Sequence, residues 1–404
     1  MRTKNTTTAT VTTSSPSLSN RRAFIRLVGG GAVFAAAPAL TGCSSDFPSA
    51  AVSAWQPPSP GQDLRLWLLS YAILAPHPHN LQSWLVDLKQ PGEITLYCDI
   101  TRLLPETDPY SRQIMLGQGT FLELLDLAAK QAGQRAEIDL FPTGAFDGKN
   151  VDRRPTARIR LTADKTLSKD PLFGQILKRH TNRNVYKTKD VSDVALQAIK
   201  NSVAGLPVKI GFAGADAADL RNQHRVIAKE AWRIELITPR TMLESLKLMR
   251  VGPEEIRQNP DGISVNTPFI RAVVALGLFD RSKAPASDDS AIASQITDFN
   301  AKIDTTPAFF YLITQGNDRV TQINAGRAYV RAQLAATAQG LSMHPVSQAL
   351  QEYPEQAKNY AAIHQLLKVT PARDTVQMWT RLGFASEVQP SPRRALAQLI
   401  INNT

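Results

Sequence analysis

The sequence of 404 residues contains only two cysteines, Cys43 and Cys98. If Cys43 carries a lipid, Cys98 has no partner in the chain, and an intramolecular disulfide is excluded. Cys98 alternates with Ile94 and Leu96 in a segment that reads as a strand, so the three side chains share one face. We therefore expect Cys98 to be buried, as unpaired cysteines usually are.

The sequence also lacks the residue patterns that are typical of several kinds of functional site. No basic run is interleaved with aromatic residues, which argues against nucleic-acid binding. No Ser/His/Asp or paired-carboxylate arrangement stands out as a catalytic constellation. His77 and His79 could be read as a metal pair, but they face the same way only in an extended segment and no third ligand follows nearby. No metal site is predicted.

Acidic residues are absent from residues 1–42, which hold five basic residues and leave a formal charge of +6 out of +11 for the rest of the chain. The pair Arg21-Arg22 precedes the apolar run Leu27–Leu40, which is too short and too rich in glycine for a membrane span. This pattern is typical of a Tat export signal. We therefore predict an exported protein of the periplasm or cell envelope. The remaining positive charge favours an anionic ligand such as a phosphate.

Two processing sites are possible after this signal. Leu40-Thr41-Gly42-Cys43 has the form of a lipobox, whose cysteine could carry a lipid and attach the protein to a membrane. Ala37-Pro38-Ala39 offers an ordinary signal-peptidase site instead. Residues 1–43 are thus read as the signal, and residues 44–62, rich in Pro, Ser and Ala, as a linker.

The stretch Ala75–Trp84 is the strongest candidate for a binding segment. It follows an apolar helical run, Leu64–Leu74, and its two prolines are expected to stop that helix and to hold the backbone extended. Asn80 and Gln82 follow, and their amides present donors and acceptors together, which suits the imide-like edge of a planar heterocycle. Trp84 supplies an aromatic wall. A satisfied polar loop is the alternative.

Two basic segments could bind a phosphate. Arg179 and Arg183 are four residues apart and can converge on one side of a helical turn. Arg393 and Arg394 lie near the end of the chain, and their planar, forked donors match phosphate oxygens. A solvated basic surface and a solvated tail are the alternatives.

Hydrophobic periodicity predicts both helices and strands, and the small residues of Gly117-Gln118-Gly119 and of the helix near residue 326 allow close helix packing. Ser111 is the expected helix cap, and Gly133 and Gly340 are expected to end helices. The expected helices are Ser111–Ala132, Asp190–Val203, Ala217–Thr238 and Ile323–Gln339, and the expected strands are Ile94–Asp99, Ile138–Phe141, Ala157–Leu161, Leu206–Phe212 and Ala308–Thr314.

These motifs together resemble the nitroreductase-like flavoproteins, most closely their Acg-type branch. In that family Ala-Pro-Ser is followed by Asn-Thr-Gln-Pro-Trp and faces the FMN ring; Asn80, Gln82 and Trp84 match, while His77 and Ser83 replace the usual Ser and Pro. The family's Arg-Arg-x-x-Arg opening and terminal Pro-x-Arg-Arg bind the FMN phosphate, which carries that role to the arginines at 179, 183, 393 and 394.

The segment Leu341–Gln348 resembles the family's loop whose backbone N–H approaches flavin N5, which adds Ser342 and Met343 to the implied site. His344 is the nearest candidate proton donor, although a satisfied loop histidine is the plainer interpretation. No other catalytic residue is predicted, because the flavin carries the chemistry.

The resemblance implies an α+β fold of the nitroreductase type, with antiparallel sheets flanked by helices. Its two tandem halves would form an intrachain pseudo-dimer around one FMN site. Residues 63–165 would form the first half and residues 166–404 the second, with residues 239–300 as a helical lid or insertion. The implied function is an FMN-dependent oxidoreductase that passes electrons to a nitro, quinone or similar small-molecule acceptor from an unknown donor. A non-catalytic flavin-binding or flavin-sequestering protein, and a lipid-anchored structural protein without a cofactor, are the alternatives.

Overall fold

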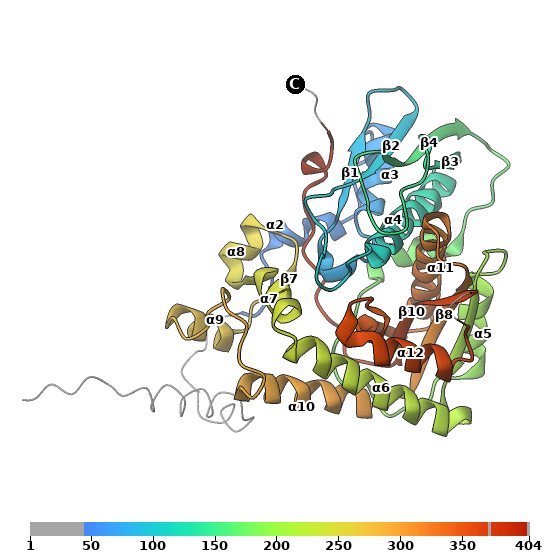
Figure 1. Ribbon diagram of the computed structural model, residues 1–404. Helices are drawn as coiled ribbons and strands as arrows, with labels where there is room; N and C mark the ends of the chain where they lie inside the picture. Colours follow the sequence, from blue (N-terminus) through green and yellow to red (C-terminus); the bar gives the residue numbers. More distant parts are fainter. Residues whose placement is uncertain (1–43, 371–372, 402–404) are drawn as a thin grey trace, which may run out of the picture.

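The computed structural model describes residues 44–370 and 373–401 and has an α+β fold with two separate four-stranded antiparallel sheets (Figure 1). The predicted α+β class is confirmed. The predicted Tat signal and both predicted processing sites, Cys43 included, lie outside the described residues.

The first sheet has the strand order β1-β2-β4-β3. Ile94, Leu96 and Cys98 share its buried face, so the expected burial of Cys98 is confirmed. The outer strand β3 is longer than predicted and pairs with β4 along its full length, although its own side chains are at most half-buried and give little hydrophobic signal. The strands are β1 (Trp84–Asp87), β2 (Glu93–Cys98), β3 (Gln134–Leu140) and β4 (Pro155–Ala163).

The second sheet has the order β5-β8-β10-β9, with β8 in a central position as predicted. Residues 342–345, expected as loop, form an edge strand because they pair with β10. Strand β10 was not predicted; it is buried along its whole length although it carries several polar residues. The strands are β5 (Lys209–Ala213), β8 (Ala308–Gln315), β9 (Ser342–Pro345) and β10 (Asp374–Gly383).

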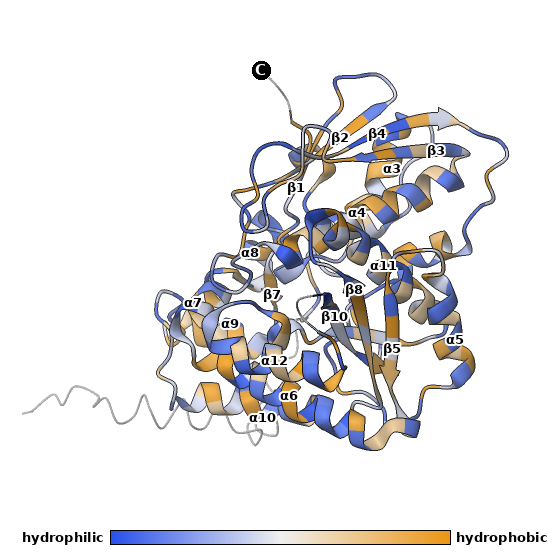
Figure 2. Ribbon diagram, turned by 45° about the vertical axis from the view of Figure 1, so that its right-hand side comes forward, coloured by the Kyte–Doolittle hydropathy of each residue, from blue (hydrophilic) through white to orange (hydrophobic). Residues whose placement is uncertain are grey.

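Each sheet is packed against helices whose positions agree with the predicted periodicity. Hydrophobic and hydrophilic residues alternate along α6 (Figure 2), as expected for a helix with one face on the core. The short helix α2 (Ser49–Val52) comes first; α3 (Leu64–Ala72) and α4 (Arg112–Gln131) belong to the first sheet, and α5 (Asp193–Ser202), α6 (Ala218–Ile237), α11 (Arg319–Ala338) and α12 (Ala357–Leu366) follow.

The cap of α4 differs from the prediction. Ser111 precedes the helix, but it has a left-handed φ of 55° and its side chain forms no capping hydrogen bond. The carboxylate of Asp108 accepts hydrogen bonds from the backbone N–H groups of Gln113 and Ile114 instead, at 3.1 and 2.9 Å. A residue outside the usual capping position therefore satisfies the helix N-terminus.

Helices α4 and α11 hold the two sheets together, and their closeness confirms the prediction from small residues. A Cβ atom on Gly119 would lie 2.0 Å from the carbonyl oxygen of Ile323, and one on Gly326 would lie 2.0 Å from that of Leu116. The main apolar cluster of the first half also includes Ile323, Val330 and Leu334 of α11. The two parts of the chain therefore share a core.

Residues 239–300 form small helices and a two-stranded parallel sheet at one side of the molecule (Figure 1). The elements are α7 (Pro239–Lys247), β6 (Met249–Val251), α8 (Gly252–Gln258), β7 (Ile263–Val265), α9 (Pro268–Ala275) and α10 (Ser290–Asp304). The predicted boundaries of the two halves and of this insertion stay predictions. Within the described ranges, none of the helices has the length and apolar character needed to cross a membrane.

Candidate functional site

The turn after α3 has an unusual backbone. Pro78–Asn80 forms a single 3₁₀ turn where an extended segment was expected, and His77 just before it is extended. His79, Asn80 and Gln82 have φ values of 45°, 54° and 54°, a left-handed conformation that L-residues seldom adopt. Each such residue costs on the order of 1 kcal/mol or more, so the surrounding structure must hold the turn in place.

The side chains of this turn supply part of that support. Asn80 donates from Nδ2 to the carbonyl of Pro392 at 3.0 Å and accepts from Arg393 Nη1 at 2.7 Å. Gln82 is fully buried, donates from Nε2 to Asn80 and Pro260 carbonyls at 3.2 and 2.9 Å, and accepts from the backbone N–H of Arg394. Both amides are therefore bonded within the chain, and their predicted contact with a flavin stays a prediction.

Arg393 uses its guanidinium to close the end of α3. It donates to the backbone carbonyls of Ile73, Leu74 and Ala75 and, from Nη1, to Asn80 Oδ1. All three of its nitrogen atoms therefore already have acceptors in the chain.

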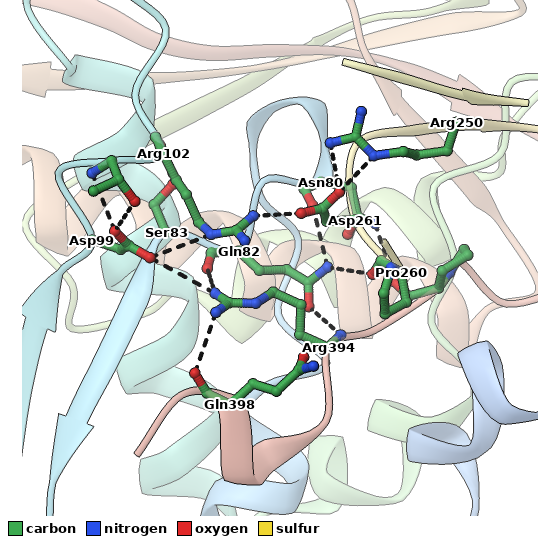
Figure 3. Close-up of polar contacts among 12 residues, drawn as sticks. Asn80, Gln82, Ser83, Asp99, Arg102, Arg250, Pro260, Asp261, Arg394 and Gln398 are labelled. Atoms are coloured by element: carbon green, nitrogen blue, oxygen red, sulfur yellow. Dashed lines mark hydrogen bonds and ion pairs between the residues drawn. The ribbon is translucent and has the colours of Figure 1, made fainter. Parts of the chain in front are cut away.

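Arg394 takes part in a second polar network, which Figure 3 shows in full. Its Nη1 lies 3.3 Å from the carbonyl oxygen of Gln82 and 3.9 Å from the carboxylate of Asp99, and its Nη2 lies 3.2 Å from the carbonyl oxygen of Gln398. This network fixes the turn to the C-terminal segment.

Trp84 lies in the core, fully buried between His77 at 5.0 Å and Phe121 at 5.2 Å between ring centroids. The imidazole of His77 occupies the space left by Gly117, where a Cβ atom would lie 2.4 Å from its Cδ2. Burial lowers the pKa of His77 to about 3, so this ring is neutral at pH 7. Gly117 thus makes room for a ring where a helix contact was expected.

Arg179 is buried and bridges the two halves of the chain. It donates to the carbonyl of Leu74 at 3.0 Å and to Gln333 Oε1 at 3.3 Å, while its Nε has no partner among the described residues. Trp55 lies against the guanidinium groups of both Arg179 and Arg393, at 5.5 and 5.1 Å from the ring centroid. Burial lowers the pKa of Arg179 to about 10, so the side chain stays charged at pH 7.

Arg183 is the least constrained of the four predicted arginines. It is exposed, and it forms no hydrogen bond or ion pair with any residue that the structure describes. The surrounding protein nevertheless lowers its pKa by desolvation, and Tyr329 and Tyr186 act in the opposite direction. Tyr329 is buried, and its hydroxyl has no partner among the described residues.

His344 stands beside these groups on β9. Arg381, buried in β10, can only donate, so its Nη1 donates to His344 Nδ1 at 3.2 Å and leaves the imidazole proton on Nε2. The pKa of His344 lies well below its usual value because of burial and because of Arg183, Arg381 and Lys302. His344 is therefore a neutral donor at pH 7.

The edge strand also carries Ser342 and Met343. Met343 is buried, and its carbonyl accepts from the backbone N–H of Asn182 at 3.1 Å, which ties β9 to the segment that carries Arg183. Ser342 is half-buried and pairs with Gly383 in the sheet. The structure therefore brings this strand next to the basic segment.

Three further residues belong to this region, and sequence reasoning did not select them for it: Tyr329 on α11, Arg381 on β10 and Lys302 on α10. His79 was considered only as a metal ligand, and burial and then Arg183 lower its pKa to about 4. Every charged group that perturbs the pKa of His344 is a cation. The region is thus rich in donors and suited to an anion. Only the convergence of distant elements reveals it.

Two further observations concern possible sites elsewhere in the described chain. In the described ranges, no cluster of three or more His, Cys, Asp or Glu side chains is arranged to hold a metal ion. A surface groove of about 610 Å³ lies between α5, α11 and the 3₁₀ segment Pro171–Lys178, and none of the predicted site residues lines it.

Two curated proteins of Mycobacterium tuberculosis, from strains CDC 1551 and H37Rv, are similar to this chain. Both carry the provisional name NAD(P)H nitroreductase and are 26% identical over 346 residues, which cover 82% of this chain and 90% of theirs. No family model matches the chain. The similarity supports the nitroreductase-like assignment over nearly the full length of these relatives.

Solved structures give weaker likenesses. The FMN-dependent nitroreductase of Mycobacterium smegmatis in complex with NADPH has a TM-score of 0.36 at 16% identity, covering 57% of this chain and 96% of that one. A Desulfovibrio desulfuricans nitroreductase in complex with FMN has a TM-score of 0.32 at 15% identity, covering 59% and 99%. Scores this low add nothing to the assignment of this chain.

Proposed function

We propose that this protein is an FMN-dependent oxidoreductase of the nitroreductase type. The observation that carries the proposal is Arg183, an arginine without a partner among the described residues, in a donor-rich region built from both halves of the chain. An exposed guanidinium whose donors are free can form charge-assisted hydrogen bonds with an anionic ligand. The similarity to the mycobacterial nitroreductases names the ligand class.

The residues present fit FMN. Arg183 and the free Nε of Arg179 would hold its phosphate, and the Tyr329 hydroxyl is a further donor in reach of both charges. Bound FMN accepts and returns a hydride at N5, and this chemistry belongs to the cofactor. The strained turn at 79–82 and strand β9 would position the ring edges, in line with their predicted roles.

His344 would act on the substrate side of this region. Its Nε2 carries a proton and its ring stays neutral at pH 7, so it can donate a hydrogen bond to an oxygen of a nitro or quinone acceptor without adding charge. The electron donor proposed for this chain is NAD(P)H, the one named for the curated relatives.

The test is a titration followed by turnover. The purified protein, loaded with FMN, should show flavin absorbance bands that bleach with NADPH or NADH under anaerobic conditions and return when a nitroaromatic or quinone is added. Absence of flavin binding would overturn the proposal. Flavin bands that no donor bleaches would leave only the non-catalytic alternative.

That alternative, a flavin-sequestering protein, is favoured by one observation. Residues 260–262 of the predicted lid are bonded to the strained turn, through Gln82 Nε2 to the Pro260 carbonyl and through the Gly262 N–H to the Asn80 carbonyl. A lid fixed at the site would retain a cofactor. Slow release of FMN combined with no reoxidation by any acceptor would support sequestration over turnover.

We also propose export through the Tat route, based on Arg21 and Arg22 in the sequence. The change of Arg21→Lys together with Arg22→Lys should leave precursor inside the cell, measured by fractionation and immunoblotting. Cys43→Ala should release the exported protein from membranes if Cys43 is the anchor. Normal export of the double variant would contradict the Tat assignment.

A further inference from the structure

Helix α9 has an apolar surface that the rest of the described chain covers only in part. Its sequence from Pro268 to Ala275 is Pro-Phe-Ile-Arg-Ala-Val-Val-Ala, and none of these residues is buried. None of its apolar side chains belongs to any of the four hydrophobic clusters of the molecule. Leu276, directly after the helix, is 64% exposed. A surface helix normally buries an apolar stripe, whereas the described residues leave the apolar side of α9 only half-covered.

The position of α9 in the fold is also peripheral. It lies at the outer edge of the molecule, beyond α7 and α8 (Figure 1), and rests against the short strand β6. Arg271 is its one charged residue, and its guanidinium forms no hydrogen bond or ion pair with any described residue. A long cationic side chain at the border of an apolar surface can reach a polar interface while its stem stays on the apolar side.

The N-terminal end of the described chain lies directly beside this helix. Asn266, two residues before α9, is buried and donates from Nδ2 to the carbonyl of Asp46 at 2.5 Å. Gln389 fixes the same segment, donating to the Ser45 carbonyl at 3.1 Å and accepting from the Phe47 N–H at 2.8 Å. Cys43 precedes Asp46 by three residues, a distance that a fully extended chain covers in about 10 Å.

We propose that α9 is a peripheral membrane-contact helix, which lies in the lipid interface next to the N-terminal attachment point. A lipid on Cys43 would have a tether of only three residues, and the surface of the protein around Asp46 and Asn266 would then face the bilayer. The half-buried Phe269 and Val273 and the exposed Leu276, spaced four and three apart, lie on one side of the helix. The occupant is the lipid bilayer, and the proposal is independent of the flavin chemistry.

The test uses the full chain with a tryptophan placed on α9. Phe269→Trp and Leu276→Trp report from the helix, and Val194→Trp, at a position on α5 that is 77% exposed, is the matched control. Each protein is reconstituted in vesicles of phosphatidylcholine and phosphatidylglycerol, with and without brominated acyl chains, and the emission of the parent protein is subtracted. Circular dichroism confirms that each variant is folded.

We expect the added emission at positions 269 and 276 to shift to shorter wavelength with vesicles and to be quenched several-fold by the brominated lipid, while position 194 stays unquenched. Lack of quenching at both helix positions would overturn the proposal. A blue-shifted emission already present without vesicles would do so too. In that case, a blue shift that depends on protein concentration would indicate that a second copy covers α9. A blue shift that does not depend on concentration would indicate that the chain's own Leu27–Leu40 segment covers it.

Discussion

Arg183 differs from the other three predicted phosphate ligands in what its guanidinium contacts. Arg393 and Arg394 donate to carbonyls that hold the turn and the C-terminal segment, and Arg179 keeps only its Nε free. Arg183 has no such contacts among the described residues. At the scale of single residues, the free donors therefore make Arg183 the first residue to test as a contact of the proposed anionic ligand.

Arg183→Ala should weaken FMN binding by about ten- to a hundredfold, because a charged hydrogen bond is worth roughly 1.5–3 kcal/mol. The affinity for riboflavin, which lacks the phosphate, should fall much less. Dissociation constants for both flavins measure the effect. Arg153→Ala removes an exposed arginine of the loop before β4 and is the matched control. An unchanged preference for FMN in the Arg183 variant would remove this residue from the phosphate site.

Glu235 is a buried carboxyl that affects stability and not the site. It accepts from Gln351 Nε2 at 2.7 Å, and burial followed by the nearby Glu244 raises its pKa to about 7. Between pH 4.5 and 7 the folded protein therefore holds a proton that the unfolded chain releases, so this group lowers the free energy of unfolding as the pH rises through that window.

Glu235→Gln should remove this dependence. The variant should match the parent near pH 5 and exceed its free energy of unfolding at pH 8 by up to about 3 kcal/mol, since each pKa unit corresponds to about 1.4 kcal/mol. Urea unfolding of both proteins from pH 5 to 8 gives the difference, in which the contributions of other titrating groups cancel. A difference that does not grow with pH would contradict the raised pKa.

At the scale of elements, the contact of α4 with α11 determines how the two sheets are placed. Both helices cross at glycines, and each glycine faces a backbone carbonyl of the other helix. Backbone atoms cannot move aside as the end of a flexible side chain can. The sequence indicated close packing from its small residues, but it did not identify the partner helix.

Gly326→Ala should destabilise the protein by about 1–3 kcal/mol or more, because the new methyl group would lie 2.0 Å from the carbonyl oxygen of Leu116. The sign of the change in the free energy of unfolding is informative, because alanine in place of glycine stabilises an unobstructed helix by about 1 kcal/mol. Chemical denaturation measures it, with Gly148→Ala as a control at a site that has nothing within 4 Å. A stabilised Gly326 variant would rule out the tight crossing.

At the scale of the whole molecule, the insertion is fastened to the first half at the strained turn. Asp261 is buried and pairs with Arg102 of the first half and with Arg250 of the insertion, the latter at 2.9 Å (Figure 3). Farther along, the carboxylate of Glu244 accepts from the backbone N–H groups of Glu106 and Thr107, both at 3.0 Å. The turn, the insertion and the C-terminal segment are thus linked around one site.

Asp261→Ala should loosen this link at a local cost of about 2–3 kcal/mol, because two arginines lose their shared carboxylate. Hydrogen exchange of residues 252–266 should rise by about thirty- to a hundredfold, and bound FMN should dissociate faster. Asp288→Ala, at an exposed position of the same insertion, is the control. Faster exchange with unchanged FMN release would show that the insertion is attached at this point but does not retain the cofactor.

The sequence alone determined the periodic features of this protein. Helices such as Arg112–Gln131 and the central strand Ala308–Gln315 were predictable because their apolar spacing reports burial directly. The candidate segments around Asn80, Arg183 and Arg393 were also visible, since their residue types are unusual in their local context.

The tertiary structure decided the rest, for physical reasons. Asp374–Gly383 is buried although it is rich in polar residues, because partners from distant elements satisfy them, as Thr306, His344 and Asn184 do for Arg381. Which arginines keep free donors depends on where backbone carbonyls happen to lie in space, and sequence spacing carries no record of that. The same holds for Ser342–Pro345, which becomes a strand only because β10 lies beside it.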